Sequence, residues 1–338
     1  MKTKRSKKIY TLIRWAIGII ILYVVFQKID FDQLLNSIAH AKLWLIILGL
    51  TNAPVLIFIA AFRWRWLMRN YFNEELSFNF TLGHYWKGLA LGFFTPASIG
   101  LDAYRIVICG KRFGKYTASA VIIIAEKILA LITCMSIVVA LYPIVPIKLV
   151  PEFKKVFYLA YVMLVACILL LILVVIVLRN KMLSVFFKRF ENYVRNMLEI
   201  ISRKININLI GNNKHISFHS LIEPLVDKKI IIIIAFSFCI QFVSSIKSQV
   251  FFCSLDYDIP FVVNLFAAPM IYFIFVLPIS FGSLGIREGV YIIIYGMFGV
   301  PIEIALIVSF FNLLGMLLNS LIGGTIMLAS KPSGTTVS

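Results

Sequence analysis

Two short stretches of this chain repeat the same order of proline, serine, glycine and arginine. One is "PASIGLDAYR", and the other is "PISFGSLGIR". Proline and glycine interrupt helices, and arginine suits bidentate contact with a phosphate. The repeated phrase therefore predicts two helix breaks that each contribute half of one site for an anionic group. The arginine follows the glycine by five residues in both, so that Pro96, Ser98, Gly100 and Arg105 match Pro278, Ser280, Gly282 and Arg287.

The chain beside each break adds to this chemistry. A helix that begins directly after a break points free N–H groups at a bound anion. Asp102 suits the N-cap of the first such helix, because aspartate is a favoured capping residue. We therefore predict a set of substrate-binding residues and a set of hairpin-tip residues. The first set is Arg105, Arg287, Ser98, Ser280, Asp102, Glu126 and Glu288, and the second is Pro96, Gly100, Pro278, Gly282 and Gly285.

Structural roles are the alternative for these residues. The pattern Pro-x-Ser-x-Gly also suits a simple turn in a membrane loop. Arg105 also fits an ordinary basic residue of a cytoplasmic loop. Arg287 and Glu288 also fit a salt bridge that holds the tip closed, or a pair at the outer interface. The recurrence of the arginine in the same register favours binding over these roles.

An acidic and a basic residue interrupt the apolar run "SAVIIIAEKILALI". Adjacent helical positions point in different directions, so Glu126 and Lys127 should not pair with each other. We expect Glu126 to face the interior of the helical bundle, towards an arginine. Ionisable residues inside a membrane are functional candidates by default.

Other chemistries lack the residues that they need. The five cysteines are scattered without metal-ligand spacing, and we find no nucleophile–base pattern and no nucleotide-binding motif. The net charge of +18 comes mostly from short loops and the N-terminus, as the positive-inside rule predicts, and not from a nucleic-acid-binding module. We therefore predict no catalytic residue, no metal, no cofactor and no nucleic-acid partner.

We expect membrane helices to carry these charged residues. The chain has 338 residues, of which 61% are hydrophobic. A membrane-crossing helix needs roughly 20 apolar residues. Charge-free runs of that length occur at 43–62, 156–178, 261–286 and 304–330. The composition therefore predicts an all-α, polytopic membrane protein.

Basic clusters set the direction of each segment. With the N-terminus in the cytoplasm, the cluster of Arg63, Arg65 and Arg69 falls on the same side as the next cluster, Arg105, Lys111, Arg112 and Lys115. The segment 80–113 must therefore form a re-entrant hairpin. By repeat, 261–300 forms a second hairpin from the opposite face. We predict one transmembrane domain, 1–338, in which a basic cytoplasmic linker, 179–229, separates two inverted repeats, about 43–142 and about 230–328. The six full spans would be 9–26, 43–62, 117–142, 156–178, 230–252 and 303–328, and eight full spans is the alternative.

The chain resembles the lysylphosphatidylglycerol synthetase transmembrane family, the flippase-like domain of the bacterial multiple peptide resistance factor. The resemblance covers nearly the whole chain. The family usually has Glu-Arg where this chain has Glu126–Lys127, and Gly-Gly where it has Gly282–Ser283. The matching residues are Arg63–Trp64, the group Pro96, Gly100, Asp102 and Arg105, the pair Glu126–Lys127, and the phrase from Pro278 to Glu288.

The resemblance implies a lipid flippase-like protein of the bacterial plasma membrane. It would translocate an anionic or aminoacylated phospholipid, or a polyprenyl-phosphate carrier, between leaflets. The chain ends ten residues after the last expected span, so we expect the translocating part without the aminoacyltransferase domain. Its partners would be an anionic membrane lipid and a separate aminoacyl- or glycosyltransferase. The alternatives are the membrane subunit of a lipid-modifying transferase, such as phosphatidylglycerol lysyltransferase, and a carrier of a small soluble anion.

Overall fold

The structure is a computed structural model in which helices dominate. It describes residues 31–72, 75–95, 98–113, 116–145, 161, 162, 165, 169, 230–276 and 286–330. Over these residues the chain forms helices and no strand, which confirms the predicted all-α class. The helices are α2 (Phe31–Ala39), α3 (Leu43–Phe72), α4 (Phe78–Phe93), α5 (Ile99–Phe113), α6 (Tyr116–Leu141), α10 (Ile230–Ser254), α11 (Phe261–Val276), α12 (Ile286–Gly296) and α13 (Ile302–Ala329).

Four helices are long and apolar enough to cross a membrane. They contain the segments Leu43–Asn70, Ile122–Leu141, Ile231–Ser254 and Ile302–Ala329. Their outward faces expose large apolar side chains such as Phe58, Phe238 and Leu321, which suits contact with lipid. The chain is therefore a multi-pass membrane protein. The expected spans 9–26 and 156–178 and the linker 179–229 lie outside the continuously described residues.

The other core helices are too short to cross a bilayer alone. α4 and α11 have 16 residues each, or about 24 Å at 1.5 Å per residue. α5 and α12 are shorter still. A hydrocarbon core is about 30 Å thick. Both halves of the chain therefore present a long helix, two short helices and a long helix in that order.

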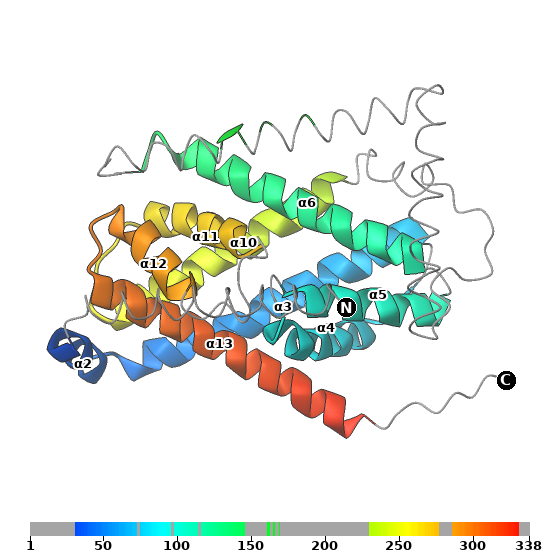
Figure 1. The fold of residues 1–338 in the computed structure, drawn as a ribbon, viewed down its shortest axis with the longest axis horizontal. Helices are drawn as coiled ribbons and strands as arrows, with labels where there is room; N and C mark the ends of the chain where they lie inside the picture. The colour runs from blue at the N-terminus through cyan, green and yellow to red at the C-terminus, as the bar shows by residue number, and fades with distance from the viewer. Residues whose placement is uncertain are drawn as a thin grey trace, which may run out of the picture.

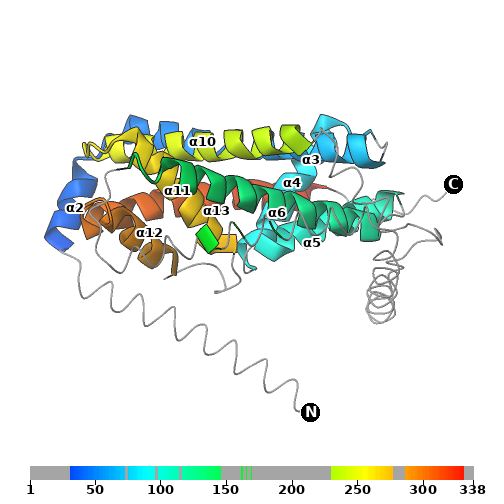
Figure 2. The ribbon, with the colours of Figure 1, turned by 90° about the horizontal axis from the view of Figure 1, so that it is seen from above.

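The four long helices form a bundle that carries one pair of short helices towards each end. Figure 1 shows α4 and α5 on one side and α11 and α12 on the other, and Figure 2 agrees. α3 packs along α10, α4 along α13, and α6 along α11. Lys42 at the start of α3 meets Asp256 just past the end of α10, and Arg63 on α3 meets Ser237 on α10. α3 and α10 therefore run in opposite directions.

α4 and α5 form a tight antiparallel hairpin. The His84 Nδ1 lies 2.8 Å from the Tyr104 hydroxyl, and Gly92 near the end of α4 packs on Leu101 near the start of α5. Ser98 in the connection has a positive φ of 54°. Gly100 approaches the Leu91 carbonyl so closely that a Cβ atom would lie 2.5 Å from its oxygen. The helix therefore breaks where the first repeated phrase predicted a break.

Several of the predicted site and hairpin-tip residues lie outside the described residues, namely Pro96, Pro278, Ser280, Gly282 and Gly285. Within the described residues, Thr95 holds the N-terminus of α5, because its hydroxyl accepts a hydrogen bond from the Gly100 amide at 2.7 Å. The expected capping role of Asp102 is wrong, because Asp102 lies inside the first turn of α5 and its carboxylate contacts side chains.

Candidate functional site

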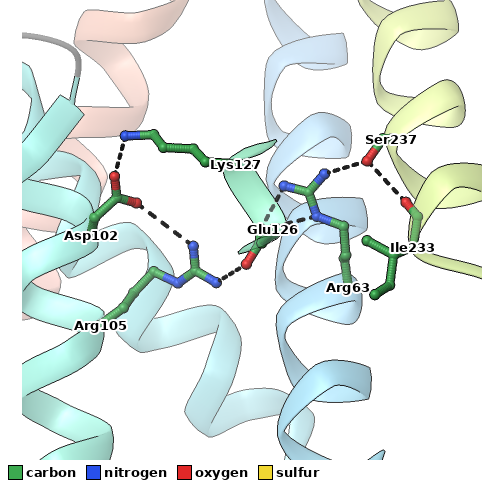
Figure 3. Close-up of polar contacts among 7 residues, drawn as sticks. All are labelled: Arg63, Asp102, Arg105, Glu126, Lys127, Ile233 and Ser237. Atoms are coloured by element: carbon green, nitrogen blue, oxygen red, sulfur yellow. Dashed lines mark hydrogen bonds and ion pairs between the residues drawn. The ribbon is translucent and has the colours of Figure 1, made fainter. Parts of the chain in front are cut away.

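A chain of alternating charges crosses the interior of the bundle between α3, α5 and α6. Glu126 on α6 is at its centre (Figure 3). Its Oε1 accepts hydrogen bonds from Arg63 Nη2 at 2.6 Å and from Arg63 Nε at 3.0 Å. Its Oε2 accepts a hydrogen bond from Arg105 Nη2 at 2.6 Å. Glu126 is 3% exposed, Arg105 2% and Arg63 7%, so all three are removed from solvent.

The same chain of charges continues from Arg105 to Asp102 on α5 and then to Lys127 on α6. Arg105 Nη1 lies 3.9 Å from Asp102 Oδ1, one turn earlier on α5. The other carboxylate oxygen of Asp102 accepts a hydrogen bond from Lys127 Nζ. Glu126 and Lys127 are neighbours in sequence, yet each contacts a different oppositely charged residue, because adjacent positions of α6 point in different directions. In order, the charges are Lys127, Asp102, Arg105, Glu126 and Arg63.

Aromatic rings enclose the middle of this charge chain. The guanidinium carbon of Arg105 lies 4.8 Å from the ring centre of Trp64 and 5.3 Å from that of Tyr85. A cation over an aromatic face is attracted by the ring quadrupole, and more strongly where water is excluded. Trp64 is fully buried. Arg105 is therefore fixed by two rings and two carboxylates, which makes it a positioning residue for Glu126.

The Arg63 end of the charge chain opens into a cavity. Arg63 Nη1 donates to the Ser237 hydroxyl at 2.9 Å, and that hydroxyl donates to the Ile233 carbonyl at 2.9 Å. The cavity has a volume of about 190 Å³ and lies between α3, α4, α6, α10 and α11. Its described lining consists of Leu56, Ile57, Ala60, Arg63, Tyr85, Leu89, Ala130, Ser237, Ile240, Gln241 and Tyr272. Arg63 is the one charged residue in that lining.

Arg63 is the residue of this cluster that could meet a ligand. It is the cation of the cluster that lines the cavity, and its guanidinium is bound by Glu126. An anionic group that enters the cavity would meet Arg63, and arginine suits bidentate contact with phosphate. Within the described ranges, histidine, cysteine and carboxylate side chains nowhere gather in a set of three that could hold a metal ion.

The second predicted arginine lies in different surroundings. Arg287 and Glu288 begin α12 and are both buried. Arg287 Nη2 donates a weak hydrogen bond to Met316 Sδ at 3.3 Å, and its guanidinium lies 5.8 Å from the Phe275 ring centre. α12 and α5 lie towards different ends of the bundle (Figures 1 and 2).

The structure thus gathers part of the predicted site. It brings Asp102, Arg105 and Glu126 together, and it places Arg287 and Glu288 in another part of the bundle. Ser98 lies half-buried at the tip of the α4–α5 hairpin, where its Cβ packs near Gly92. The substrate-binding role of each of these residues stays a prediction.

Sequence reasoning missed Arg63 as a site residue. It placed Arg63 with Arg65 and Arg69 in a cytoplasmic cluster after the second span, but α3 continues to Phe72. A helical stripe could have revealed the difference. Ile57, Ala60 and Arg63 recur at three-residue intervals and all line the cavity, whereas Arg65 and Arg69 fall on another face.

A family model matches the chain over most of its length. The family model for the lysylphosphatidylglycerol synthase TM region matches residues 11–323, which include the whole charge chain and both repeated phrases. Comparisons with curated proteins and with solved structures give no match. Because the family model covers most of the sequence, the chain belongs to the lysylphosphatidylglycerol synthase TM region family.

Proposed function

We propose that this protein moves a lipid with an anionic headgroup between the two leaflets of a bacterial plasma membrane. One observation carries the proposal: a buried network of opposite charges reaches a cavity, at Arg63, inside a bundle of membrane helices. Intramembrane ionisable residues commonly mark substrate pathways. The family, whose name ties it to a lipid, supports a lipid as the substrate.

The proposed architecture is an inverted repeat of about 43–142 and about 230–328, with six full spans, two re-entrant hairpins and a cytoplasmic N-terminus. Its support is the matching order of long and short helices in the two halves. The opposite directions of α3 and α10 support it further, because corresponding helices of inverted repeats run in opposite directions. The packing of α4 on α13 and of α11 on α6 is the pairing that such a symmetry would produce.

The proposed mechanism uses Arg63 as the contact to the headgroup phosphate. Glu126 holds the guanidinium of Arg63 through two nitrogens, and Arg105 holds Glu126 in place. Rocking of one half against the other would then expose the cavity to either leaflet. The lipid would come from, or go to, a separate aminoacyl- or glycosyltransferase. Arg287 and Glu288 would act on the opposite face of the same pathway.

The test is headgroup translocation in proteoliposomes that contain the purified full chain. Phosphatidylglycerol, lysylphosphatidylglycerol and a polyprenyl phosphate would each be followed with the original protein and with Arg63→Ala. Arg69→Ala is the matched control, because Arg69 is on the same helix but its ion pair with Glu75 is exposed.

We expect at least one lipid to move, at a rate that Arg63→Ala lowers strongly and Arg69→Ala leaves nearly unchanged. If folded protein moves none of the three lipids, the flippase proposal is wrong. The membrane-subunit and soluble-anion alternatives would then take its place. If both variants slow translocation equally, Arg63 has no special contact with the headgroup.

A further inference from the structure

We infer that the hydroxyl groups of Tyr85 and Tyr272 bind the phosphate group of the ligand together with Arg63. This inference rests on the proposed function and names two further contact residues of that same site. Tyr85 is on α4 in the first half of the chain, and Tyr272 is on α11 in the second half. The ligand is then held between the two halves, and each half contributes at least one contact.

The two tyrosines meet at the cavity. Both side chains line it, as Arg63 does. Both interact electrostatically with Arg63, and they interact with each other. Tyr85 is only 9% exposed, and its ring is held against the guanidinium of Arg105, with 5.3 Å between the ring centre and the guanidinium carbon. Tyr272 is half-buried. The cavity wall therefore gathers two phenol groups around one guanidinium.

These phenols differ from the other polar groups of the lining in their hydrogen bonds. The Ser237 hydroxyl accepts a hydrogen bond from Arg63 and donates one to a backbone carbonyl, and Gln241 Nε2 donates to Cys134 Sγ at 3.1 Å. Within the part of the chain that the structure describes, neither tyrosine hydroxyl has a hydrogen-bond partner. A buried tyrosine hydroxyl usually has one. A ligand in the cavity can supply that partner.

Arg63 keeps donors for the same ligand although Glu126 binds it. Its Nε, Nη1 and Nη2 atoms each donate one hydrogen bond, to Glu126 or to Ser237. A guanidinium has five N–H groups, so two of them remain beyond these three bonds. They belong to Nη1 and Nη2, the two nitrogens that form a bidentate contact with a phosphate.

The donors at the cavity suit an oxyanion with several acceptor oxygens. A guanidinium donates hydrogen bonds and accepts none, and a phenol donates through its O–H. A phosphate can accept from the guanidinium and from both phenols at once, since its oxygens point in different directions. Such bonds are stronger than those between neutral groups. The same contacts suit a phosphate in a lipid and a phosphate in solution, so the experiment includes both.

The first experiment measures ligand binding to the purified full-length protein in detergent by native mass spectrometry. The probes are phosphatidylglycerol and diacylglycerol with the same acyl chains, which lacks the phosphate. We expect Tyr85→Phe and Tyr272→Phe each to weaken binding of phosphatidylglycerol at least about tenfold, because each removes one hydrogen bond to a charged group. Binding of diacylglycerol should not change. An equal effect on both probes would mean that the hydroxyls only shape the cavity, which overturns the inference.

Tyr295→Phe is the matched control. It makes the same change of side chain, but the Tyr295 hydroxyl donates to Asn264 Oδ1 at 2.8 Å, away from the cavity. Loss of that bond should lower the melting temperature and leave binding of phosphatidylglycerol intact. Tyr85→Phe and Tyr272→Phe should do the reverse, because no described residue loses a hydrogen bond in either variant. A lower melting temperature without weaker binding in these two variants would assign the hydroxyls a structural role and overturn the inference.

The outcomes separate this inference from the proposed function. If the original protein moves phosphatidylglycerol but both variants bind it as tightly as the original does, the inference is wrong and the flippase proposal stands. If Tyr85→Phe alone weakens binding, the contact from the second half is wrong. Inorganic phosphate is added as a competitor: its displacement of phosphatidylglycerol from the original protein but not from Tyr272→Phe would support the tyrosine contacts and favour a soluble anion over a lipid. If the folded original protein neither binds nor moves any tested lipid, the flippase proposal itself fails.

Discussion

The two halves of this molecule share an order of helices but differ in their buried polar chemistry. The first half, α3 to α6, buries a chain of alternating full charges around Glu126. The second half, α10 to α13, also buries charged residues, namely Arg287, Glu288 and Glu303. It differs in having a neutral network, in which Asn264 Nδ2 donates to Gln249 Oε1 at 2.6 Å and the Tyr295 hydroxyl donates to Asn264 Oδ1 at 2.8 Å.

Similar architecture does not require similar function from each half. A satisfied neutral network makes a part of the structure rigid and specific. A network of charges that reaches a cavity through Arg63 can contact a ligand. We therefore expect headgroup recognition mainly in the first half and a scaffold role for the neutral network of the second half.

Loss of the central carboxylate should have the largest effect. Glu126→Ala leaves the guanidiniums of Arg63 and Arg105 buried without their shared partner. Removing one partner of a buried ion pair typically costs about 3–5 kcal/mol. We expect a large fall in the melting temperature of the purified protein in detergent. Glu75→Ala, which removes the carboxylate of the exposed Arg69 pair, is the control. A melting temperature equal to that of the control would show that Glu126 does not hold the arginines.

Disruption of the neutral network should have a smaller effect, and one of a different kind. Asn264→Ala leaves Gln249 and the Tyr295 hydroxyl without the bonds that Asn264 supplies. A buried polar group that loses its partner costs about 1–3 kcal/mol. The melting temperature should fall, while the order of rates among lipids stays as in the original protein. A change in headgroup preference would place part of the recognition in the second half.

The exposed contact between the halves should matter little. Lys42 Nζ and the Asp256 carboxylate pair at the surface, where water screens both charges. Such pairs contribute about 0.2–1 kcal/mol. Lys42→Met should therefore shift the melting temperature only slightly and leave translocation intact. A strong loss of transport would mean that this end of the α3–α10 contact controls the motion of the halves.

Energetic coupling between the two predicted arginines should be smallest of all. Arg105→Ala, Arg287→Ala and the double variant form a double-mutant cycle in thermal stability. Sites without shared partners add within about 0.5 kcal/mol. We expect that additivity, because Arg105 contacts Glu126 and Asp102 while Arg287 contacts Met316 and Phe275. Coupling well above that value would restore the sequence-based prediction of one shared site.

The sequence was most informative where apolar segments are long and where helix-breaking residues recur. The expected spans 43–62, 117–142, 230–252 and 303–328 fall in the four long helices α3, α6, α10 and α13, and the first repeated phrase predicted the break between α4 and α5. The expectation that Glu126 faces an arginine followed from the cost of a lone charge in an apolar helix. That reasoning needs only local sequence, and the contact with Arg105 agrees with it.

Side-chain partners across helices were beyond such reasoning. The role of Arg63 depends on α3 continuing past the apolar run, so that a charge at the end of the run becomes buried. The separation of Arg105 from Arg287 depends on how the two hairpins dock on the long helices. A motif fixes the residue types and their spacing along the chain, but it does not fix the distance between two copies of itself.

The contact between α4 and α13 has a mechanical consequence. Gly323 lies so close to α4 that a Cβ atom would sit 2.0 Å from the Trp86 carbonyl oxygen. Trp86 Nε1 also donates to Asn319 Oδ1 at 3.3 Å. Backbones in such contact cannot slide past each other without collision, so rocking of the two halves must pivot at the contact between α4 and α13. Because α4 brings Tyr85 and Leu89 to the cavity wall, any displacement of the last helix is transmitted to the place where the headgroup would sit.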